Sequence, residues 1–388
     1  MPIRFALIGC GKITERLALP QLKLCEDAEI AALVDIRREI ARHWAGIYGV
    51  DKSRVWTDWR RMLREAEVDA VAVNVPNVLH AEIATGALQA KKHVIVEKPM
   101  AISLAEADTM IEAASRNGRY LMVEQTQRFD PMHEVAREVL RAGVLGELTY
   151  VSGEIGHAGP EYWSGTRQNW FIDKRQSGGG VLMDIGIHLA DLLRWLSGKE
   201  IARVCCHAAH LKPDLEVEDS ALALLEFKDG TLGSLRASWA TQPYRFSTQI
   251  EGRHGMLRVE FGATHPVVVK LCKREGDPNY PLGEDFHPHI PPRSQVRGAY
   301  PYFVSCIVNK VSPSPSGQEG RAALEIILAA YESLRTGGWV DLPLAAGHFQ
   351  RRAHSQSDQR LLRRRGGQQR GNNSRVGQEA KRRGRNSS

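Results

Sequence analysis

The chain has 388 residues, of which 43% are hydrophobic and 25% charged, and its formal net charge is +7. This length exceeds what one hydrophobic core usually supports, so we expect two domains. No segment approaches the roughly 18 consecutive apolar residues of a membrane span, and the N-terminus lacks the features of a signal peptide, so we expect a soluble, cytoplasmic protein without membrane contact.

The positive charge is concentrated near the C-terminus. Residues 350–388 contain twelve Lys or Arg and two acidic residues, a net of +10, which leaves −3 on residues 1–349. This composition, rich in Arg, Gln, Gly, Ser and Asn, cannot bury enough apolar surface to fold. We predict that residues 346–388 are a disordered basic tail. Nucleic acid would have only this tail to bind and is not an expected partner.

Residues 1–125 alternate short apolar runs with segments of helical periodicity. Helices are expected at 15–24, 59–67, 81–90 and 104–116, and strands at 4–8, 30–34, 70–75, 93–96 and 120–123. This alternation is typical of a doubly wound parallel sheet, the Rossmann type of α/β fold, and predicts a dinucleotide-binding domain over 1–125.

The pattern changes after Pro131. One predicted helix (132–141) is followed by strand-like runs at 148–154, 204–210, 220–227, 232–239, 247–251 and 256–260, and further helices are expected at 183–196 and 321–334. Short turns such as Lys228-Asp229-Gly230 join neighbouring runs, which parallel strands do not allow. Residues 126–345 are therefore predicted to form an α+β domain for substrate binding and oligomerisation, with a large, mostly antiparallel sheet.

A glycine-rich turn follows the first strand, where a dinucleotide fingerprint belongs. Gly9 allows the tight turn, Gly11 lets the backbone approach a pyrophosphate, and Lys12, Ile13 and Thr14 open a helix, although Thr14 replaces the usual third glycine.

Asp35 ends the second strand, 24 residues after Gly11, where a carboxylate can accept hydrogen bonds from both ribose hydroxyls. This favours NAD as the cofactor. NADP stays possible because Arg37 and Arg38 come directly afterwards and could hold a 2′-phosphate.

Lysine stands at the end of the fourth predicted strand, in Glu97-Lys98-Pro99. Open parallel sheets bind ligands beyond the carboxyl ends of their strands, so a catalytic or binding role explains this charge better than packing does.

In the second predicted domain, Asp184 and His188 are four residues apart after Gly178-Gly179-Gly180 and project from one face of a helix start.

Taken in order, these motifs, together with Asn74-Val75-Pro76-Asn77 and His80, resemble the glucose-fructose oxidoreductase, inositol dehydrogenase and MocA (Gfo/Idh/MocA) family over about residues 3–343. The resemblance implies a two-domain NAD(P)-dependent oxidoreductase that acts on a secondary hydroxyl or ketone of a sugar, an inositol-like polyol or a sugar derivative. It also implies that the cofactor-binding residues are Gly9, Gly11, Lys12, Ile13, Asp35, Arg37, Asn74, Pro76, Asn77, His80, Glu97 and Lys98.

In that family the residues matching Lys98 and His188 contact the reacting oxygen, and the peptide before the matching proline is often cis. Asp184 would orient the pair or share the proton relay. We assign His188 as the base and Lys98 as the group that stabilises the developing alkoxide, with the reverse assignment open, because a desolvated lysine can also act as a base.

Other polar and aromatic residues are candidates for the substrate pocket. Gln127 and Arg128 follow the last Rossmann strand, where a hinge contact is the alternative. A long loop carries aromatic and acidic side chains suited to sugar rings: Tyr162, Trp163, Trp170 and Asp173. The six cysteines show no metal-ligand spacing, and no metal site is predicted.

Two other functions use the same fold. A redox-neutral NAD-dependent glycosidase would oxidise and then re-reduce its substrate, and a dinucleotide-binding regulator would catalyse nothing. Lys98 and His188 together argue against the regulator. We expect a homodimer or homotetramer, because a broad antiparallel sheet that covers a ligand on one face usually buries the other face in a partner.

Overall fold

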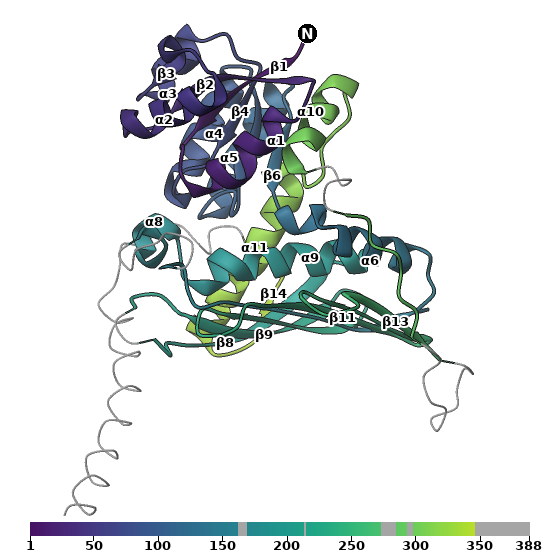
Figure 1. Ribbon diagram of the computed structural model, residues 1–388. Coiled ribbons are helices and arrows are strands. Elements are labelled where there is room, and N and C mark those ends of the chain that lie inside the picture. Colours follow the sequence, from purple (N-terminus) through teal and green to yellow (C-terminus); the bar gives the residue numbers. More distant parts are fainter. Residues whose placement is uncertain (162–168, 213–214, 273–284, 293–297, 346–388) are drawn as a thin grey trace, which may run out of the picture. The chain divides into compact units, whose positions relative to one another are not determined.

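The computed structural model describes residues 1–161, 169–212, 215–272, 285–292 and 298–345 (Figure 1). The predicted basic tail lies outside the described residues. Among the described residues, none of the helices combines the length and the apolar character needed to cross a membrane.

The N-terminal part contains a six-stranded sheet whose paired strands are all parallel, in the order β3-β2-β1-β4-β5-β6. Its strands are β1 (Ile3–Ile8), β2 (Ala28–Val34), β3 (Val55–Trp56), β4 (Ala70–Val73), β5 (His93–Glu97) and β6 (Leu121–Glu124). These strands are almost wholly apolar because helices cover both faces of the sheet. The predicted parallel sheet is confirmed, with β3 as an additional edge strand.

The helices and single turns of this part are η1 (Thr14–Ala18), α1 (Leu19–Lys23), α2 (Arg38–Tyr48), η2 (Lys52–Arg54), α3 (Trp59–Glu65), η3 (Asn77–Leu79), α4 (His80–Gln89) and α5 (Leu104–Arg116). A further helix, α10 (Ala299–Asn309), returns from the C-terminal part of the sequence to this sheet (Figure 1). Its residues Tyr300, Phe303 and Val304 share a hydrophobic core with Phe5 and Leu7 of β1. The parallel sheet is therefore completed by a segment about 175 residues beyond its last strand.

The second sheet has eight strands in the order β13-β12-β11-β7-β10-β9-β8-β14. They are β7 (Leu148–Gly156), β8 (Ile201–Ala209), β9 (Ser220–Phe227), β10 (Leu232–Ser238), β11 (Arg245–Gly252), β12 (Gly255–Glu260), β13 (Val267–Leu271) and β14 (Val340–Asp341). Every pair in this sheet is antiparallel except β10 with β7, which confirms the predicted mostly antiparallel sheet.

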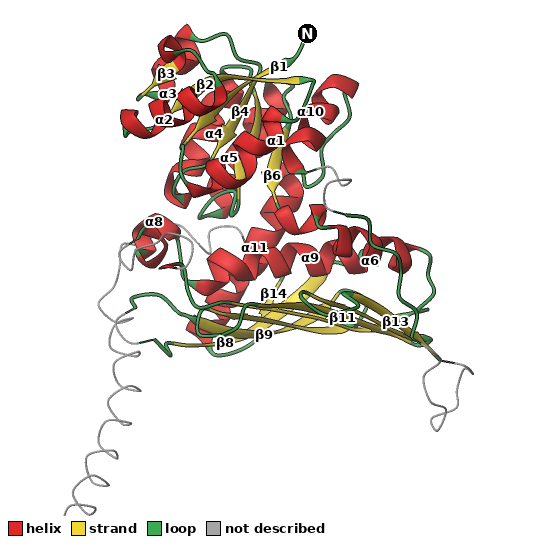
Figure 2. Ribbon diagram, viewed as in Figure 1, coloured by secondary structure: helices red, strands yellow, loops and turns green. Residues whose placement is uncertain are grey.

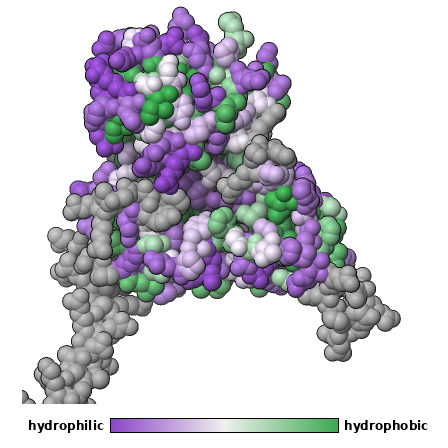
Figure 3. Space-filling view, viewed as in Figure 1, coloured by the Kyte–Doolittle hydropathy of each residue, from purple (hydrophilic) through white to green (hydrophobic). Residues whose placement is uncertain are grey.

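Helices cover one face of this second sheet (Figure 2). The crossover from β6 passes through η4 (Thr126–Phe129), and the other elements are α6 (Pro131–Arg141), η5 (Trp170–Ile172), α8 (Lys174–Ser177), η6 (Leu182–Gly186), α9 (Ile187–Ser197) and α11 (Gly317–Thr336). The strands alternate accordingly: in β9, Ala221, Ala223 and Leu225 face the helices, while Leu222 and Leu224 are exposed. Elsewhere on the visible surface, hydrophobic residues occur in small groups among hydrophilic ones (Figure 3).

Candidate active site

The glycine-rich turn after β1 is held by a chain of hydrogen bonds. Gly9 has a φ of 88°, and a Cβ added to it would lie 2.1 Å from the carbonyl oxygen of Asn74, so no side chain fits there. The hydroxyl of Thr14 donates to the Gly9 carbonyl (2.5 Å) and accepts from the Asn74 side-chain amide (2.9 Å). Thr14 thus uses the place of the third glycine to tie the helix start to the turn.

The turn leaves room for a dinucleotide. A Cβ added to Gly11 would meet no atom within 4 Å, so the backbone there faces open space that a pyrophosphate can enter. The Asp35 carboxylate accepts from the backbone N–H groups of Cys10 (2.9 Å) and Arg37 (2.8 Å), which fixes it beside the turn. Lys12 and Ile13 are exposed on the same turn. These residues fit the adenosine and pyrophosphate part of NAD.

The segment after β4 is fastened to neighbouring loops. The Asn77 side chain donates to the Ser177 carbonyl (2.8 Å), and η3 begins directly after Pro76. The His80 ring nitrogens lie 2.8 Å from the Pro99 carbonyl oxygen and 2.7 Å from that of Val75, and the ring is fully buried. This geometry favours a role for His80 in shaping the loop that carries Lys98, while cofactor contact by Asn77 and His80 stays a prediction.

Lys98, directly after β5, meets Asp184 of η6. The peptide between Lys98 and Pro99 is cis, and Lys98 Nζ donates to both the backbone carbonyl (2.7 Å) and the carboxylate Oδ1 (3.0 Å) of Asp184. The second carboxylate oxygen of Asp184 accepts from the indole N–H of Trp239 (3.1 Å). Burial alone would raise the pKa of Asp184, but the Lys98 ammonium brings that pKa below its ordinary value. The pair is therefore a largely buried ion pair at the carboxyl end of β5.

His188 is held by a different residue. Its Nδ1 lies 3.1 Å from the side-chain oxygen of Gln125, and the ring is buried. Burial and the charge of Lys98 lower the pKa of His188 to about 3, so the imidazole is neutral at physiological pH. The sequence pattern predicts Asp184 and His188 on one face, and the charge of Asp184 does act on His188. The Asp184 carboxylate, however, bonds to Lys98 and Trp239.

Sequence reasoning missed His157 and Trp239. They directly follow β7 and β10, the one parallel pair of the second sheet, whose carboxyl ends therefore share an edge. The backbone N–H of His157 bonds to Ser238 O (3.0 Å), and the charges of Lys98 and Asp184 both act on the pKa of His157, which burial lowers. The sequence shows His157 and Trp239 near the ends of predicted strands, but only the parallel pairing of β7 with β10 reveals that both lie at the edge that carries the Lys98–Asp184 pair.

Glu124 and Tyr300, which the sequence analysis did not single out, form a network with the predicted residues Glu97 and Asn74 next to Lys98. Glu97 and Glu124 are register partners on β5 and β6, and the Glu97 carboxylate accepts the Lys98 backbone N–H (3.0 Å). The Tyr300 hydroxyl of α10 donates to Glu124 (2.9 Å), and the Asn74 side-chain amide donates to that hydroxyl (3.2 Å). Burial and the neighbouring carboxylate raise the pKa of Glu124 well above its ordinary value. This network connects the glycine-rich turn with the Lys98 loop.

Glu124→Gln should stabilise the protein at neutral pH. Because folding raises the pKa of Glu124, the folded state keeps a proton that the unfolded chain releases, so wild-type stability falls as pH rises above about 4.3, the ordinary pKa of glutamate. Glutamine can accept from Tyr300 and donate to Glu97 without that loss. We expect the free energy of unfolding to increase by at least about 1 kcal/mol at pH 7 relative to wild type, and the increase to vanish near pH 4.

Urea denaturation of both proteins across this pH range measures the difference. Glu138→Gln, on the exposed side of α6, is the control and should change stability little at any pH. A Glu124→Gln protein that is destabilised equally at pH 4 and pH 7 would show that folding does not raise the pKa of Glu124.

The positions of Gln127 and Arg128 do not favour the predicted substrate binding. The Arg128 guanidinium binds Asp191 (2.6 and 2.7 Å), Glu319 (2.5 Å) and Ser314 (3.0 Å) and is buried. The guanidinium therefore makes four hydrogen bonds to protein groups, and the hinge alternative is favoured over substrate binding. Gln127 is half-buried on the same turn.

The structure describes two of the four loop residues that are predicted to bind substrate, Trp170 and Asp173. Tyr162 and Trp163 lie outside the described residues. Trp170 stacks on Phe171 with ring centroids 3.9 Å apart, and Asp173 caps α8 by accepting from the backbone N–H of Arg175. Both residues have structural partners, and their contact with substrate stays a prediction.

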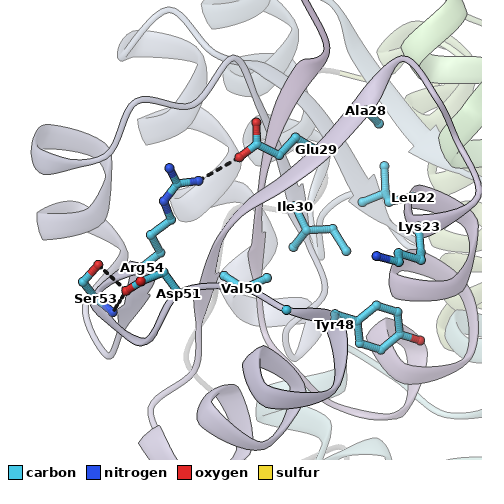
Figure 4. A pocket seen from close by; sticks show the side chains of 11 residues that line it. Leu22, Lys23, Ala28, Glu29, Ile30, Tyr48, Val50, Asp51, Ser53 and Arg54 are labelled. Atoms are coloured by element: carbon cyan, nitrogen blue, oxygen red, sulfur yellow. Dashed lines mark hydrogen bonds and ion pairs between the residues drawn. The ribbon is translucent and has the colours of Figure 1, made fainter.

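A separate surface pocket of about 560 Å³ lies between α1, the start of β2 and the end of α2 (Figure 4). Glu29 and Arg54 form an ion pair at its edge (2.7 Å). Ligands of parallel sheets bind at the carboxyl ends of the strands, whereas this pocket lies at the amino end of β2, so it is not the candidate active site.

Known families and proteins share these features. The family described as oxidoreductase family, NAD-binding Rossmann fold, matches residues 3–125, and the GFO/IDH/MocA C-terminal domain matches residues 133–258. D-glucoside 3-dehydrogenase from Escherichia coli K12 is 31% identical over 358 residues, covering 88% of this chain and 98% of that protein. The chain belongs to the Gfo/Idh/MocA family.

Two other Gfo/Idh/MocA relatives agree with this assignment. Myo-inositol 2-dehydrogenase from Thermotoga maritima is 27% identical, covering 89% of this chain and all of that protein. The crystal structure of the WlbA dehydrogenase from Bordetella pertussis, in complex with NADH and UDP-GlcNAcA, superposes with a TM-score of 0.75 at 26% identity and covers 89% of this chain and 100% of that one. The predicted family, an oxidoreductase with an NAD-binding Rossmann domain, is confirmed.

Proposed function

We propose that this chain transfers a hydride between NAD and a secondary hydroxyl or ketone of a sugar, an inositol-like polyol or a sugar derivative. The observation that carries the proposal is the meeting of Lys98, from the carboxyl end of a parallel strand, with Asp184 and the neighbouring His188 of the second domain. Relatives that are named as acting on a D-glucoside and on myo-inositol support this substrate class.

Lys98, Asp184 and His188 have different roles in the reaction of the substrate hydroxyl. When bound, NAD supplies the hydride acceptor for the carbinol carbon. The Lys98 ammonium stabilises negative charge on the substrate oxygen, and Asp184 aims it, because its carbonyl and carboxylate oxygens both hold Nζ. His188, which is neutral, accepts the proton of the hydroxyl as general base. Trp239 in turn fixes the carboxylate of Asp184.

The low pKa of His188 bears on its role as base. A pKa of about 3 lies well below the working pH, so the imidazole is neutral with a free lone pair, but it is a weaker base than an imidazole whose pKa lies near the working pH. The reverse assignment, with Lys98 as base, is tested by the variants in the Discussion.

The proposal is tested by offering the purified protein NAD together with sugars and polyols and measuring NADH. Net NADH formation supports the dehydrogenase. Cleavage of a nitrophenyl glycoside by protein with NAD already bound, without net NADH, would instead identify the redox-neutral glycosidase. Binding of NAD with neither reaction would favour the regulator.

We further propose that NAD is preferred over NADP, and Asp35→Ser tests this. The Asp35 carboxylate is fixed beside the turn by two backbone N–H groups, where its charge disfavours a 2′-phosphate and its oxygens suit ribose hydroxyls. Loss of bonds to a charged group should weaken NADH binding by about 10- to 100-fold and NADPH binding much less.

Fluorescence titration with NADH and NADPH measures both dissociation constants without turnover. Asp51→Ser, which replaces a helix-capping carboxylate elsewhere in this domain, is the control and should change neither constant. Unchanged NADH affinity in Asp35→Ser would contradict the assignment of Asp35 to the ribose.

We also propose that the exposed face of the second sheet is an interface between copies of this chain. Leu222, Leu224 and Leu232 on this face are 49%, 50% and 55% exposed, and all lie on the adjacent strands β9 and β10. Grouped apolar side chains of this kind are typical of protein interfaces. Sedimentation velocity of the full chain should give the mass of a dimer or tetramer, and a monomer at micromolar concentration would contradict the proposal.

A further inference from the structure

Gln125 is the first residue after β6 and contacts the His188 ring. Its side-chain oxygen lies 3.1 Å from Nδ1, and both residues are buried. The backbone around Gln125 is fixed as well, because its N–H donates to the Val123 carbonyl (2.8 Å) and its carbonyl accepts from the N–H of Arg128 (3.0 Å). The amide therefore meets His188 from a rigid position.

The same two elements are joined at a second point. Arg128 forms a bidentate ion pair with Asp191, with N to O distances of 2.6 and 2.7 Å. Gln125 and Arg128 are three residues apart on the crossover, and His188 and Asp191 are three residues apart on α9, so two parallel contacts connect the crossover with the helix. This pairing fixes the rotation of α9 relative to the crossover and keeps the Gln125 amide in line with the ring.

The contact determines which ring nitrogen carries the hydrogen. An amide oxygen only accepts, so Nδ1 of His188 must donate, and in a neutral imidazole the other nitrogen, Nε2, then has the free lone pair. The charged groups that face the ring are Lys98, from the end of β5, and Asp184, from η6. The Asp184 carboxylate oxygens are taken by Lys98 and Trp239.

We propose that Gln125 is the positioning residue that holds His188 in its Nδ1–H tautomer and so makes Nε2 the proton-accepting atom. The proposal rests on the proposed role of His188 as base. This role explains why residue 125 carries an amide. An uncharged acceptor orients the ring without stabilising the imidazolium, whereas a carboxylate would orient the ring and also stabilise the imidazolium.

Nitrogen NMR of the full-length protein without NAD tests the proposal directly. With ¹⁵N-labelled histidine, the His188 signals are those that disappear in His188→Gln. We expect a protonated Nδ1 and an unprotonated Nε2 at pH 7, and no titration of the ring down to pH 5. In Gln125→Leu the ring should lose this preference and populate both tautomers.

Gln125→Glu separates positioning from general disturbance. A carboxylate at this distance should keep the Nδ1–H tautomer and raise the pKa of His188 by roughly 1 to 3 units, so that the ring titrates within the accessible range. Ser314→Ala is the matched control, because it removes a hydrogen bond from the Arg128 cluster of the same crossover and leaves Gln125 in place. Its His188 signals should equal those of wild type.

Two results would overturn the proposal: an Nε2–H tautomer in the wild type, or an unchanged His188 tautomer in Gln125→Leu. Because these signals are read without cofactor or substrate, they are independent of the proposed function. If the NMR results are as expected but His188→Gln retains full turnover, the positioning of the ring stands and the role of His188 as base fails. If turnover depends on His188 and the tautomer does not depend on Gln125, only this inference fails.

Discussion

Lys98→Met should lower kcat for NADH formation by about 10²- to 10³-fold, the effect of removing one donor that stabilises a developing oxyanion. Methionine keeps the length and apolar stem of lysine but has no charge. The loss should be in kcat more than in KM, because the ammonium interacts most strongly with the charge that develops on the substrate oxygen in the transition state. Initial rates at saturating NAD measure it.

The same substitution at the other end of β5 is the matched control. Lys92 Nζ donates to the Val68 carbonyl (2.8 Å) at the amino end of the strand, far from the proposed chemistry. Lys92→Met should retain wild-type turnover. Because Lys98→Met leaves the buried Asp184 carboxylate without its cation, circular dichroism and NADH binding must show that the variant is folded. A folded Lys98→Met protein with unchanged turnover would contradict the catalytic role of Lys98.

His188→Gln should lower kcat by about 10²- to 10⁴-fold, the usual contribution of a general base. Glutamine keeps a polar side chain of similar length next to Gln125 but cannot accept and release a proton at the working pH. The dissociation constant for NADH should change little, because His188 lies on α9, away from the glycine-rich turn. Steady-state rates and NADH fluorescence titrations measure the two quantities separately.

The comparison of the two variants decides between the alternative assignments of the base. If His188 is the base, raising the pH should partly restore the rate of His188→Gln, because hydroxide can replace a missing base, and should not restore Lys98→Met. The opposite pattern would assign the base to Lys98. His207→Gln, on an exposed position of β8, is the control for both measurements.

The sequence predicts the two sheets well because their strands are apolar or alternate regularly. It misses α2, whose segment buries only Ala41 and Ala45. It misses α10 because the contacts that hold Tyr300 and Phe303 are with strands near the N-terminus, and no local pattern records such distant contacts. The two-residue strands β3 and β14 are too short to show any periodicity.

The candidate site was predictable where a residue has a fixed place relative to its own strand or helix. Lys98 and Asp35 end strands, and Asp184 and His188 open a helix, so their positions follow from local structure. The partners of these residues do not: Trp239 reaches Asp184 from 55 residues away, and Gln125 reaches His188 from 63. Arg128 illustrates the same limit, because only the fold reveals that Asp191 and Glu319 occupy its guanidinium.

The most direct test of the central claim is a stoichiometric assay with wild-type protein. Purified protein is incubated with excess NAD and a panel of neutral polyols, aldoses and glycosides, and NADH absorbance is followed together with mass spectrometry of the products. We predict that at least one compound yields one NADH for each product molecule lacking two hydrogen atoms, and that Lys98→Met forms this product at least about 10²-fold more slowly. NADH binding without any NADH formation across the panel, or product formation at the same rate by Lys98→Met, would contradict the account.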